Sequence, residues 1–228
     1  MSRSSVKVSA ASTQAEKAYA ALKRMILDNE LAAGRQLLET EAAILLGMSR
    51  TPVREAMVRL SQDGLVELRA RHGMQVMPIS AADMKEIYDV LTALESCAAQ
   101  LAAARRPSGS QLRPLEKAIM DMDAALRRDD LTAWAAADER FHLALVELSA
   151  NGRIRQLVNT YWDQSHRVRI VTLRLRPKPT GSNADHAALV ESIRRGEPEE
   201  ARRIHYEHRK RNAVMLVDLL TRLGLKQL

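Results

Sequence analysis

Apolar and polar positions alternate with a helical period in three separate segments near the start of the chain. The first segment covers about residues 14–34, where an Ala-Gly pair signals the end of a helix. Residues 39–46 predict a second, short helix, because Gly47 follows directly. A third helix is expected over about residues 50–63, after Ser49, a residue type that caps helix N-termini.

Two short runs that are typical of strands follow, at residues 65–68 and 74–77. The segment between them contains Gly73, the residue type that a hairpin turn needs. Three helices followed by a small β-hairpin make a winged helix-turn-helix. We predict this fold for residues 14–79, preceded by a flexible arm at residues 1–13.

Beyond residue 80 the pattern is helical throughout. Pro78 interrupts regular structure and Ser80 can cap the next helix, which places a domain boundary near residue 80. Helices are expected at residues 82–104, 111–127, 130–149, 153–176, 184–195 and 199–223. The predicted fold class is therefore mainly α, with an all-helical bundle domain over residues 80–228.

Composition suits packed helices and excludes two classes of protein. Apolar residues make up 46% of the chain but aromatic residues only 3%, so aliphatic side chains must build the cores. No stretch is apolar enough for a membrane span, and the N-terminus lacks the apolar core of a signal peptide. The single cysteine, Cys97, excludes an internal disulfide and suits a reducing compartment. We therefore expect a cytoplasmic protein without a membrane partner.

The net charge of +7 is spread along the chain, so the case for DNA binding depends on where the arginines lie. Arg50 and Arg54 are four residues apart at the start of the third predicted helix and share one face. From a helix in the major groove, such a pair can reach guanine edges or clamp phosphates. Ser49 and Thr51 can add hydroxyl contacts to phosphate.

The predicted hairpin adds a basic tip to this helix. Arg69, Arg71 and His72 lie beside Gly73 in the turn, and such a tip can enter a minor groove. Either element alone is explained better by a solvated charged helix or a surface turn. Their combination in this order favours a domain that reads an operator.

Four polar residues of the helical region fall on faces that are otherwise apolar. Asp138 and His142 lie in the middle of the apolar face of one predicted helix. His186 and His208 lie on the apolar stripes of two further helices, with His205 at the edge of the last stripe. A buried, unpaired carboxylate is costly in free energy. A divalent metal bound by all four residues would offset this cost.

The identity of such a metal is not fixed by the residue types. Asp with three imidazoles suits Zn²⁺, Ni²⁺, Mn²⁺ or Fe²⁺ better than Ca²⁺ or Mg²⁺, which prefer oxygen ligands. The alternative is a set of hydrogen-bonded core residues without a metal, because single inward-facing histidines are common in helical cores.

The third helix and the wing resemble the DNA-binding domain of the GntR superfamily of bacterial regulators. The Ser-Arg-Thr-Pro-Val-Arg-Glu-Ala run at residues 49–56 carries the resemblance, which covers about residues 17–77. The positions that contact operator DNA in related members fall on Arg50, Thr51, Arg54, His72 and Gly73. Thr40 stands where some relatives carry a DNA-contacting arginine, so operator preference is expected to differ.

The helical region is similar to the FCD ligand-binding domain of the FadR-type branch of this superfamily. The similar features are Leu94-Glu95, Asp138 with His142, Asn151, and His186 followed by His208. In metal-binding members the metal ligands fall on Asp138, His142, His186 and His208, with His205 as a reserve ligand. Many relatives have an arginine shortly before the Leu-Glu pair, where residues 88–93 of this chain contain none. Arg167, Arg169 and Arg174 are candidate substitutes for binding an acidic effector.

These features predict a bacterial DNA-binding transcriptional regulator, a metabolite-responsive repressor rather than an enzyme. The resemblance implies a homodimer on a palindromic operator, since one small module rarely supplies enough specificity. The expected effector is a small carboxylate or sugar acid, sensed with a divalent transition metal in the C-terminal domain. Two alternatives stay open: a metal-dependent hydrolase with a DNA-binding appendage, and a dimeric DNA-binding protein without an effector.

Overall fold

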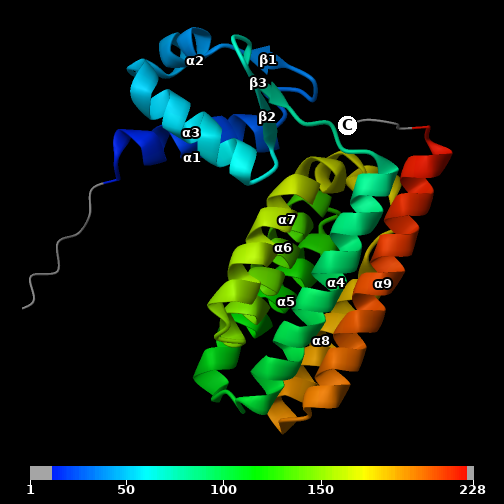
Figure 1. Cartoon of the computed structure of the whole chain (residues 1–228). Helices are drawn as coiled ribbons and strands as arrows, with labels where there is room; N and C mark the ends of the chain where they lie inside the picture. The colour runs from blue at the N-terminus through cyan, green and yellow to red at the C-terminus, as the bar shows by residue number, and fades with distance from the viewer. Residues whose placement is uncertain (1–11, 225–228) are drawn as a thin grey trace, which may run out of the picture. The chain divides into compact units, whose positions relative to one another are not determined.

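The computed structural model describes residues 12–224, and the chain divides into two compact units between Met77 and Pro78 (Figure 1). Each unit has a buried apolar core of its own. Residues 1–11 of the predicted flexible arm and residues 225–228 of the predicted helical domain lie outside the described residues.

The first unit combines helices with a small antiparallel sheet (Figure 1). Its elements are α1 (Gln14–Leu27), β1 (Gln36–Leu37), α2 (Glu39–Leu46), α3 (Arg50–Gln62), β2 (Val66–Arg69) and β3 (Gly73–Val76). The strand order is β1-β3-β2, so the buried Met74 of β3 lies between Leu37 and Leu68. This arrangement confirms the predicted winged helix-turn-helix.

The first helix ends at Leu27 rather than near Gly34. Two residues beyond its end, Asn29 has a left-handed backbone (φ +59°), through which a right-handed helix cannot continue. Gly34 also has a positive φ, +77°, but it serves the turn into β1, where its N–H donates to the Val76 carbonyl at 2.9 Å. The Ala-Gly pair therefore marks this turn and not the end of the helix.

The sheet contains one strand that the sequence did not predict. β1 pairs with β3, with Gln36 opposite Gln75 and Leu37 opposite Met74. A strand of two residues is too short to show the alternation of apolar and polar positions from which strands are predicted. The pairing of β1 with β3 joins the loop before α2 to the wing, which is the hairpin of β2 and β3.

Buried side chains of α1 and α3 fix the position of the third helix. The fully buried ones include Leu22, Ile26, Val53, Met57 and Leu60. At the edge of this core the Tyr19 hydroxyl donates to Asp63 at 2.6 Å, and the Arg59 guanidinium lies 3.9 Å from the centroid of the Tyr19 ring. The opposite face of α3, with Arg50 and Arg54, is exposed.

The second unit is all-helical, as predicted (Figure 1). Its elements are α4 (Ala81–Ala104), α5 (Gly109–Arg127), α6 (Leu131–Leu148), α7 (Gly152–Val171), a 3₁₀ turn (Leu173–Leu175), α8 (Thr180–Arg195) and α9 (Pro198–Arg222). The long helices α4 and α9 pack along one another. None of the helices in the described part of the chain is long and apolar enough to cross a membrane.

Two helices of this unit differ from their predicted bounds by four or more residues at one end. The segment predicted as one helix over residues 153–176 is interrupted after Val171, where the hydroxyl of Thr172 donates to the carbonyl four residues before it at 2.6 Å. α8 begins at Thr180, four residues earlier than predicted.

Gly73→Ala should destabilise the first unit. The φ of Gly73 is +72°, and an added Cβ would clash with the Leu37 carbonyl oxygen and lie 2.8 Å from the Leu38 Cα, which forces β1 away from β3. We expect the free energy of unfolding to fall by more than the about 1–3 kcal/mol that a positive φ alone costs a non-glycine residue. Urea unfolding followed by circular dichroism measures the loss. Gly34→Ala is the control, because its φ is +77° but an added Cβ meets nothing within 4 Å; equal losses in the two variants would contradict the clash.

Candidate functional site

The exposed N-terminus of α3 carries the predicted recognition residues. Ser49 is the N-cap residue, but its hydroxyl makes no capping hydrogen bond and remains exposed. Arg50 and Arg54 both reach toward Glu39 of α2, with nitrogen-to-oxygen distances of 3.6 and 3.7 Å. Their side chains are 67% and 74% exposed, so both guanidiniums remain accessible to a large anionic partner.

The wing lies beside this helix within the same unit. A groove of about 570 Å³ is lined by Arg50 and Arg54 of α3 and by Arg69, Arg71 and Gly73 of the hairpin. Arg71 and His72 are exposed at the hairpin tip. The structure therefore brings the predicted arginines of helix and wing to one groove, while Ser49, Thr51 and His72 do not line it. The sequence analysis did not name Glu39 as a site residue, although it lies between both recognition arginines.

In the second unit, the predicted polar residues of α6, α8 and α9 meet in the core. Nitrogen atoms of His142, His186 and His208 all lie within 4.8 Å of one another. The Oδ1 atom of Asp138 lies 3.6 Å from His142 Nε2 and 3.8 Å from His186 Nε2. All four residues are buried. The structure thus brings together the four residues that the helical pattern placed on inward faces.

Glu95 of α4 forms a second, adjoining network. Its Oε2 lies 2.6 Å from His142 Nδ1 and 3.0 Å from His205 Nε2, and its Oε1 accepts from Trp162 Nε1 at 2.7 Å and lies 3.4 Å from Arg209 Nη2. Burial by itself raises the pKa of Glu95, but the charges of Arg209 and His142 outweigh it and hold that pKa well below its usual value. The charged Glu95 accepts a hydrogen bond from His142 Nδ1, which orients the ring so that Nε2 faces Asp138.

The remaining histidines, His205, His208 and His186, have different partners. His205 turns Nε2 to Glu95, and burial lowers the pKa of His205 to about 4, so this residue is neutral and lies in the Glu95 network. His208 donates from Nδ1 to Asp185 at 2.9 Å. His186 stacks on Phe141 with 4.0 Å between ring centroids, and burial holds the pKa of His186 well below its usual value. Neither ring nitrogen of His186 has a hydrogen-bond partner among the described residues.

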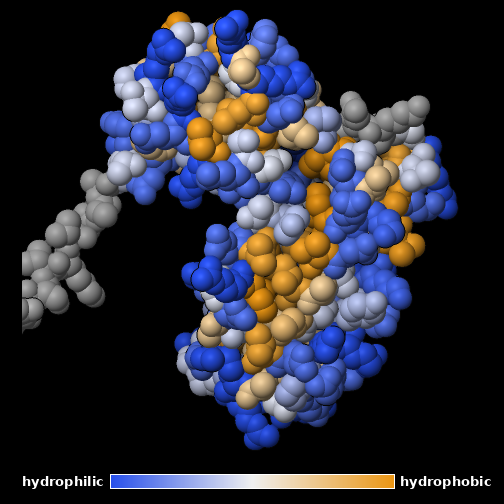
Figure 2. Space-filling model, viewed as in Figure 1, coloured by the Kyte–Doolittle hydropathy of each residue, from blue (hydrophilic) through white to orange (hydrophobic). Residues whose placement is uncertain are grey.

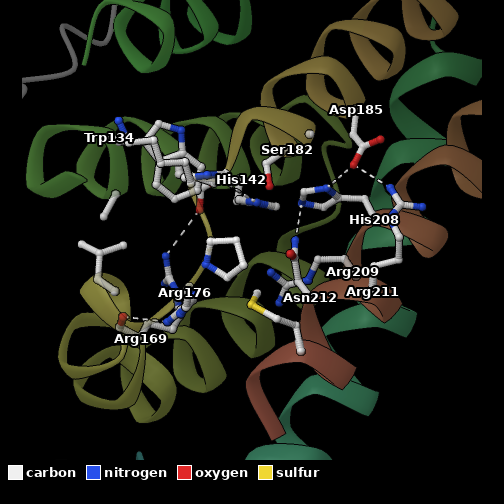
Figure 3. Close-up of a pocket in the computed structure, with 18 of the residues that line it drawn as sticks. Trp134, His142, Arg169, Arg176, Ser182, Asp185, His208, Arg209, Arg211 and Asn212 are labelled. Atoms are coloured by element: carbon white, nitrogen blue, oxygen red, sulfur yellow. Dashed lines mark hydrogen bonds and ion pairs between the residues drawn. The ribbon is translucent and has the colours of Figure 1, made fainter. Parts of the chain in front are cut away.

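A cavity of about 350 Å³ opens beside this cluster (Figure 3). Asp138, His142 and His208 line one part of it, and Arg169 and Arg176 line another. Tyr88 of α4 also lines it. The cavity therefore brings two residues of the histidine cluster together with two arginines, Arg169 of α7 and Arg176 after the 3₁₀ turn.

Of the three arginines proposed for an effector, only Arg169 lines the cavity. Arg167 is buried away from it, and Arg174 is exposed. The cavity is also lined by Arg176, which follows the 3₁₀ turn after α7. The sequence analysis overlooked Arg176, although a continuous helix over residues 153–176 would place it on the face of Arg169, seven positions away.

Both units are similar to known protein families. Residues 14–76 match the model of the bacterial regulatory proteins of the gntR family, and residues 86–211 match that of the FCD domain. An uncharacterised HTH-type transcriptional regulator from the TAR-I ttuE-ttuC' intergenic region of Agrobacterium vitis is 47% identical over 135 residues, which cover 58% of this chain and 79% of that protein. The HTH-type transcriptional repressor RspR of Escherichia coli is 31% identical over 134 residues, 59% of this chain and 58% of the relative.

Solved structures show the same fold. Escherichia coli McbR/YncC superposes with a TM-score of 0.75 at 20% sequence identity, over 90% of this chain and 98% of that one. The matched families and relatives are regulators of transcription, which removes the alternative of a hydrolase with a DNA-binding appendage. The chain belongs to the GntR family of bacterial regulatory proteins, as a DNA-binding transcriptional regulator with a helix-turn-helix domain followed by an FCD domain.

Proposed function

We propose that this regulator is a metabolite-responsive repressor whose helical domain binds a small organic acid beside a divalent metal. The observation that carries the proposal is a buried carboxylate, Asp138, beside a cluster of three buried imidazoles, of which His142 and His208 line a cavity. A homodimer in the bacterial cytoplasm would place one recognition helix and one wing on each half of a palindromic operator. Binding of the acid would change the affinity of the dimer for DNA.

The groove of the first unit supports the DNA-binding part of this proposal. The residues proposed to contact DNA are Ser49, Arg50, Thr51, Arg54, Arg71, His72 and Gly73. Arg50 and Arg54 lie at the N-terminal end of α3, the part of a recognition helix that reaches base edges. Their separations from Glu39 exceed those of a hydrogen bond, so exchanging this carboxylate for DNA costs little.

Two observations support a divalent transition metal. His186 is buried with two ring nitrogens that lack a hydrogen-bond partner in the described part of the chain, which is costly unless a ligand is bound. The His142 ring is oriented by Glu95, as metal-binding histidines are oriented by an outer carboxylate. We propose Asp138, His142, His186 and His208 as ligands of Zn²⁺, Ni²⁺, Mn²⁺ or Fe²⁺. When bound, the ion supplies positive charge that attracts a carboxylate.

The surface of the second unit supports a homodimer. Figure 2 shows apolar residues gathered on the face where α4 and α7 lie. Leu94, Cys97 and Leu101 of α4 are half-buried there, with Tyr161 of α7, and Leu157 is 47% exposed. A second copy of this chain would remove this apolar face from water.

Arg54→Ala should weaken operator binding by about fivefold to a hundredfold, which corresponds to the about 1–3 kcal/mol of one arginine contact to a base. Fluorescence anisotropy at fixed salt, with labelled DNA from the protein's own promoter region, measures the affinity. Arg24→Ala is the control, because Arg24 lies on α1 with Asp28 and Glu30 as partners. If both variants bind like the unmodified protein, α3 is not the recognition helix.

His186→Ala should abolish metal retention, because it removes one proposed ligand from the cluster. The protein is purified without chelator or affinity tag, loaded with Zn²⁺ or Ni²⁺, gel-filtered and assayed by elemental analysis. We expect the unmodified protein and the His166→Ala control to retain about one ion per chain. His166 lies on α7, beside Glu139. An unmodified protein that takes up none of Zn²⁺, Ni²⁺, Mn²⁺ and Fe²⁺ would refute the metal site.

Glu95→Gln should weaken metal binding by about 10–100-fold, because it removes the carboxylate that orients His142. It should also lower the free energy of unfolding by about 3–5 kcal/mol, since Arg209 loses its buried counter-charge. Competition with a metal-sensitive dye and urea unfolding measure the two effects. Glu147→Gln is the control: this exposed residue pairs with Arg155, and its loss should cost no more than about 0.5 kcal/mol. Indistinguishable behaviour of the two variants would argue against the role of Glu95.

A further inference from the structure

One cation in the wall of the cavity lacks a counter-charge. Other cationic side chains that line the cavity have a carboxylate at 3.6 Å or less, in the pairs Arg169–Asp138, Lys178–Asp129, Arg209–Glu95 and Arg211–Asp185. Within residues 12–224, Arg176 has no carboxylate at ion-pair distance, and the charge of Asp138 acts on it only from farther away. Its Nε and Nη2 donate to the Thr172 hydroxyl, and its Nη2 also donates to the Arg169 carbonyl, both neutral acceptors.

The surroundings of Arg176 make its unpaired charge costly in free energy. Arg176 is half-buried, and this burial lowers the pKa of its guanidinium, yet arginine does not give up its proton in proteins. A charge partly withdrawn from water is stabilised when it is paired. An anion that enters the cavity would supply the pair.

A neighbouring group adds a second donor on the same side. The Nη1 of Arg169 is buried and has no hydrogen-bond partner among the described residues. The Arg169 guanidinium lies 3.6 Å from the centroid of the Trp162 ring, which holds it in place. Figure 3 shows Arg169 and Arg176 together on one side of the pocket, with His208 on the other.

We propose that Arg176 and the Nη1 of Arg169 form a second anion subsite, so that the effector is a compact acid with two carboxylates. The inference rests on the proposed function, in which the first carboxylate lies at the metal. Arg169 spans the two subsites, because its Nη2 lies 3.6 Å from Asp138 Oδ2 and its carbonyl accepts from Arg176. A short acid therefore reaches both, and about 350 Å³ is near the lower end of small-molecule sites.

The test compares acids that differ only in the second carboxylate. Isothermal titration calorimetry of the zinc-loaded, full-length protein is carried out with succinate against butyrate, malate against 2-hydroxybutyrate, and glutarate against valerate. Gluconate represents a sugar acid with one carboxylate. We expect at least one diacid to bind about tenfold or more tightly than its partner, the contribution of a charge-assisted hydrogen bond.

Arg176→Gln should remove this preference. The affinity for the diacid should fall by about tenfold to a hundredfold, to the level of the monoacid, while the affinity for the monoacid stays unchanged. Arg174→Gln is the matched control, because Arg174 is exposed, does not line the cavity and lies two residues away. The comparison of acids on the unmodified protein does not depend on how well the variant folds.

Three results would overturn the inference. If each monoacid, or gluconate, binds the unmodified protein as tightly as the diacids do, the second subsite does not exist, although the proposed function stands. Equal losses of diacid and monoacid affinity in Arg176→Gln would place Arg176 on the first carboxylate instead. If none of these acids binds the zinc-loaded protein, the inference and the proposed acid effector both fail.

Discussion

The buried carboxylate of Glu95 constrains how the helices of the helical domain pack. It lies in the middle of α4 and is compensated by His142 of α6, Trp162 of α7, and His205 and Arg209 of α9. Removing a charge from water costs several kcal/mol, which only well-placed partners offset. The positions of these helices around α4 are therefore tied to one group. The orientation of the His142 ring, and with it the geometry of the histidine cluster, follows from that constraint.

The polar interior contains two adjoining networks, one around Glu95 and one beside the cavity. Both oxygens of Glu95 are satisfied by partners on α6, α7 and α9. Buried nitrogen atoms without partners in the described structure occur on His205 and Arg209 beside Glu95, and also on His186 and Arg169 near the cavity. Natural proteins leave polar groups unsatisfied mainly at functional sites. The cavity wall differs from the Glu95 network because Arg176 there forms no ion pair with a carboxylate of the described residues.

Local periodicity explains which parts of this site could be predicted from the sequence. Asp138, His142, His186 and His208 were predictable because each interrupts an apolar stripe on an amphipathic helix. Glu95 had no such signal, since α4 is rich in alanine and is buried over much of its circumference. Its partners are also distant in sequence, with 47 residues to His142 and 110 to His205. Pairings of that kind depend on how helices pack and leave no trace in a helical repeat.

The errors in the predicted elements have the same origin. The two-residue strand β1 exists only because β3 is there to pair with it. Gly34 was interpreted as the end of a helix, but its conformation serves a hydrogen bond to Val76, which is remote in the sequence. Arg176 was overlooked although a continuous helix would have placed it on the face of Arg169; in the structure it reaches the cavity from beyond the 3₁₀ turn. Predicted helices therefore need to be examined for every polar residue on a given face, including those next to a break.

The charge balance of the cavity links the proposed metal to the proposed acid. A divalent ion adds positive charge to a wall where Arg176 already lacks an anion, so the loaded site attracts acids more strongly than the metal-free site does. Linkage is reciprocal, and the acid must raise the affinity for the metal by the same factor. A diacid neutralises one more charge than a monoacid, and its coupling to the metal is correspondingly larger. Metal occupancy and acid sensing are then one equilibrium, in which scarcity of either ligand weakens the binding of the other.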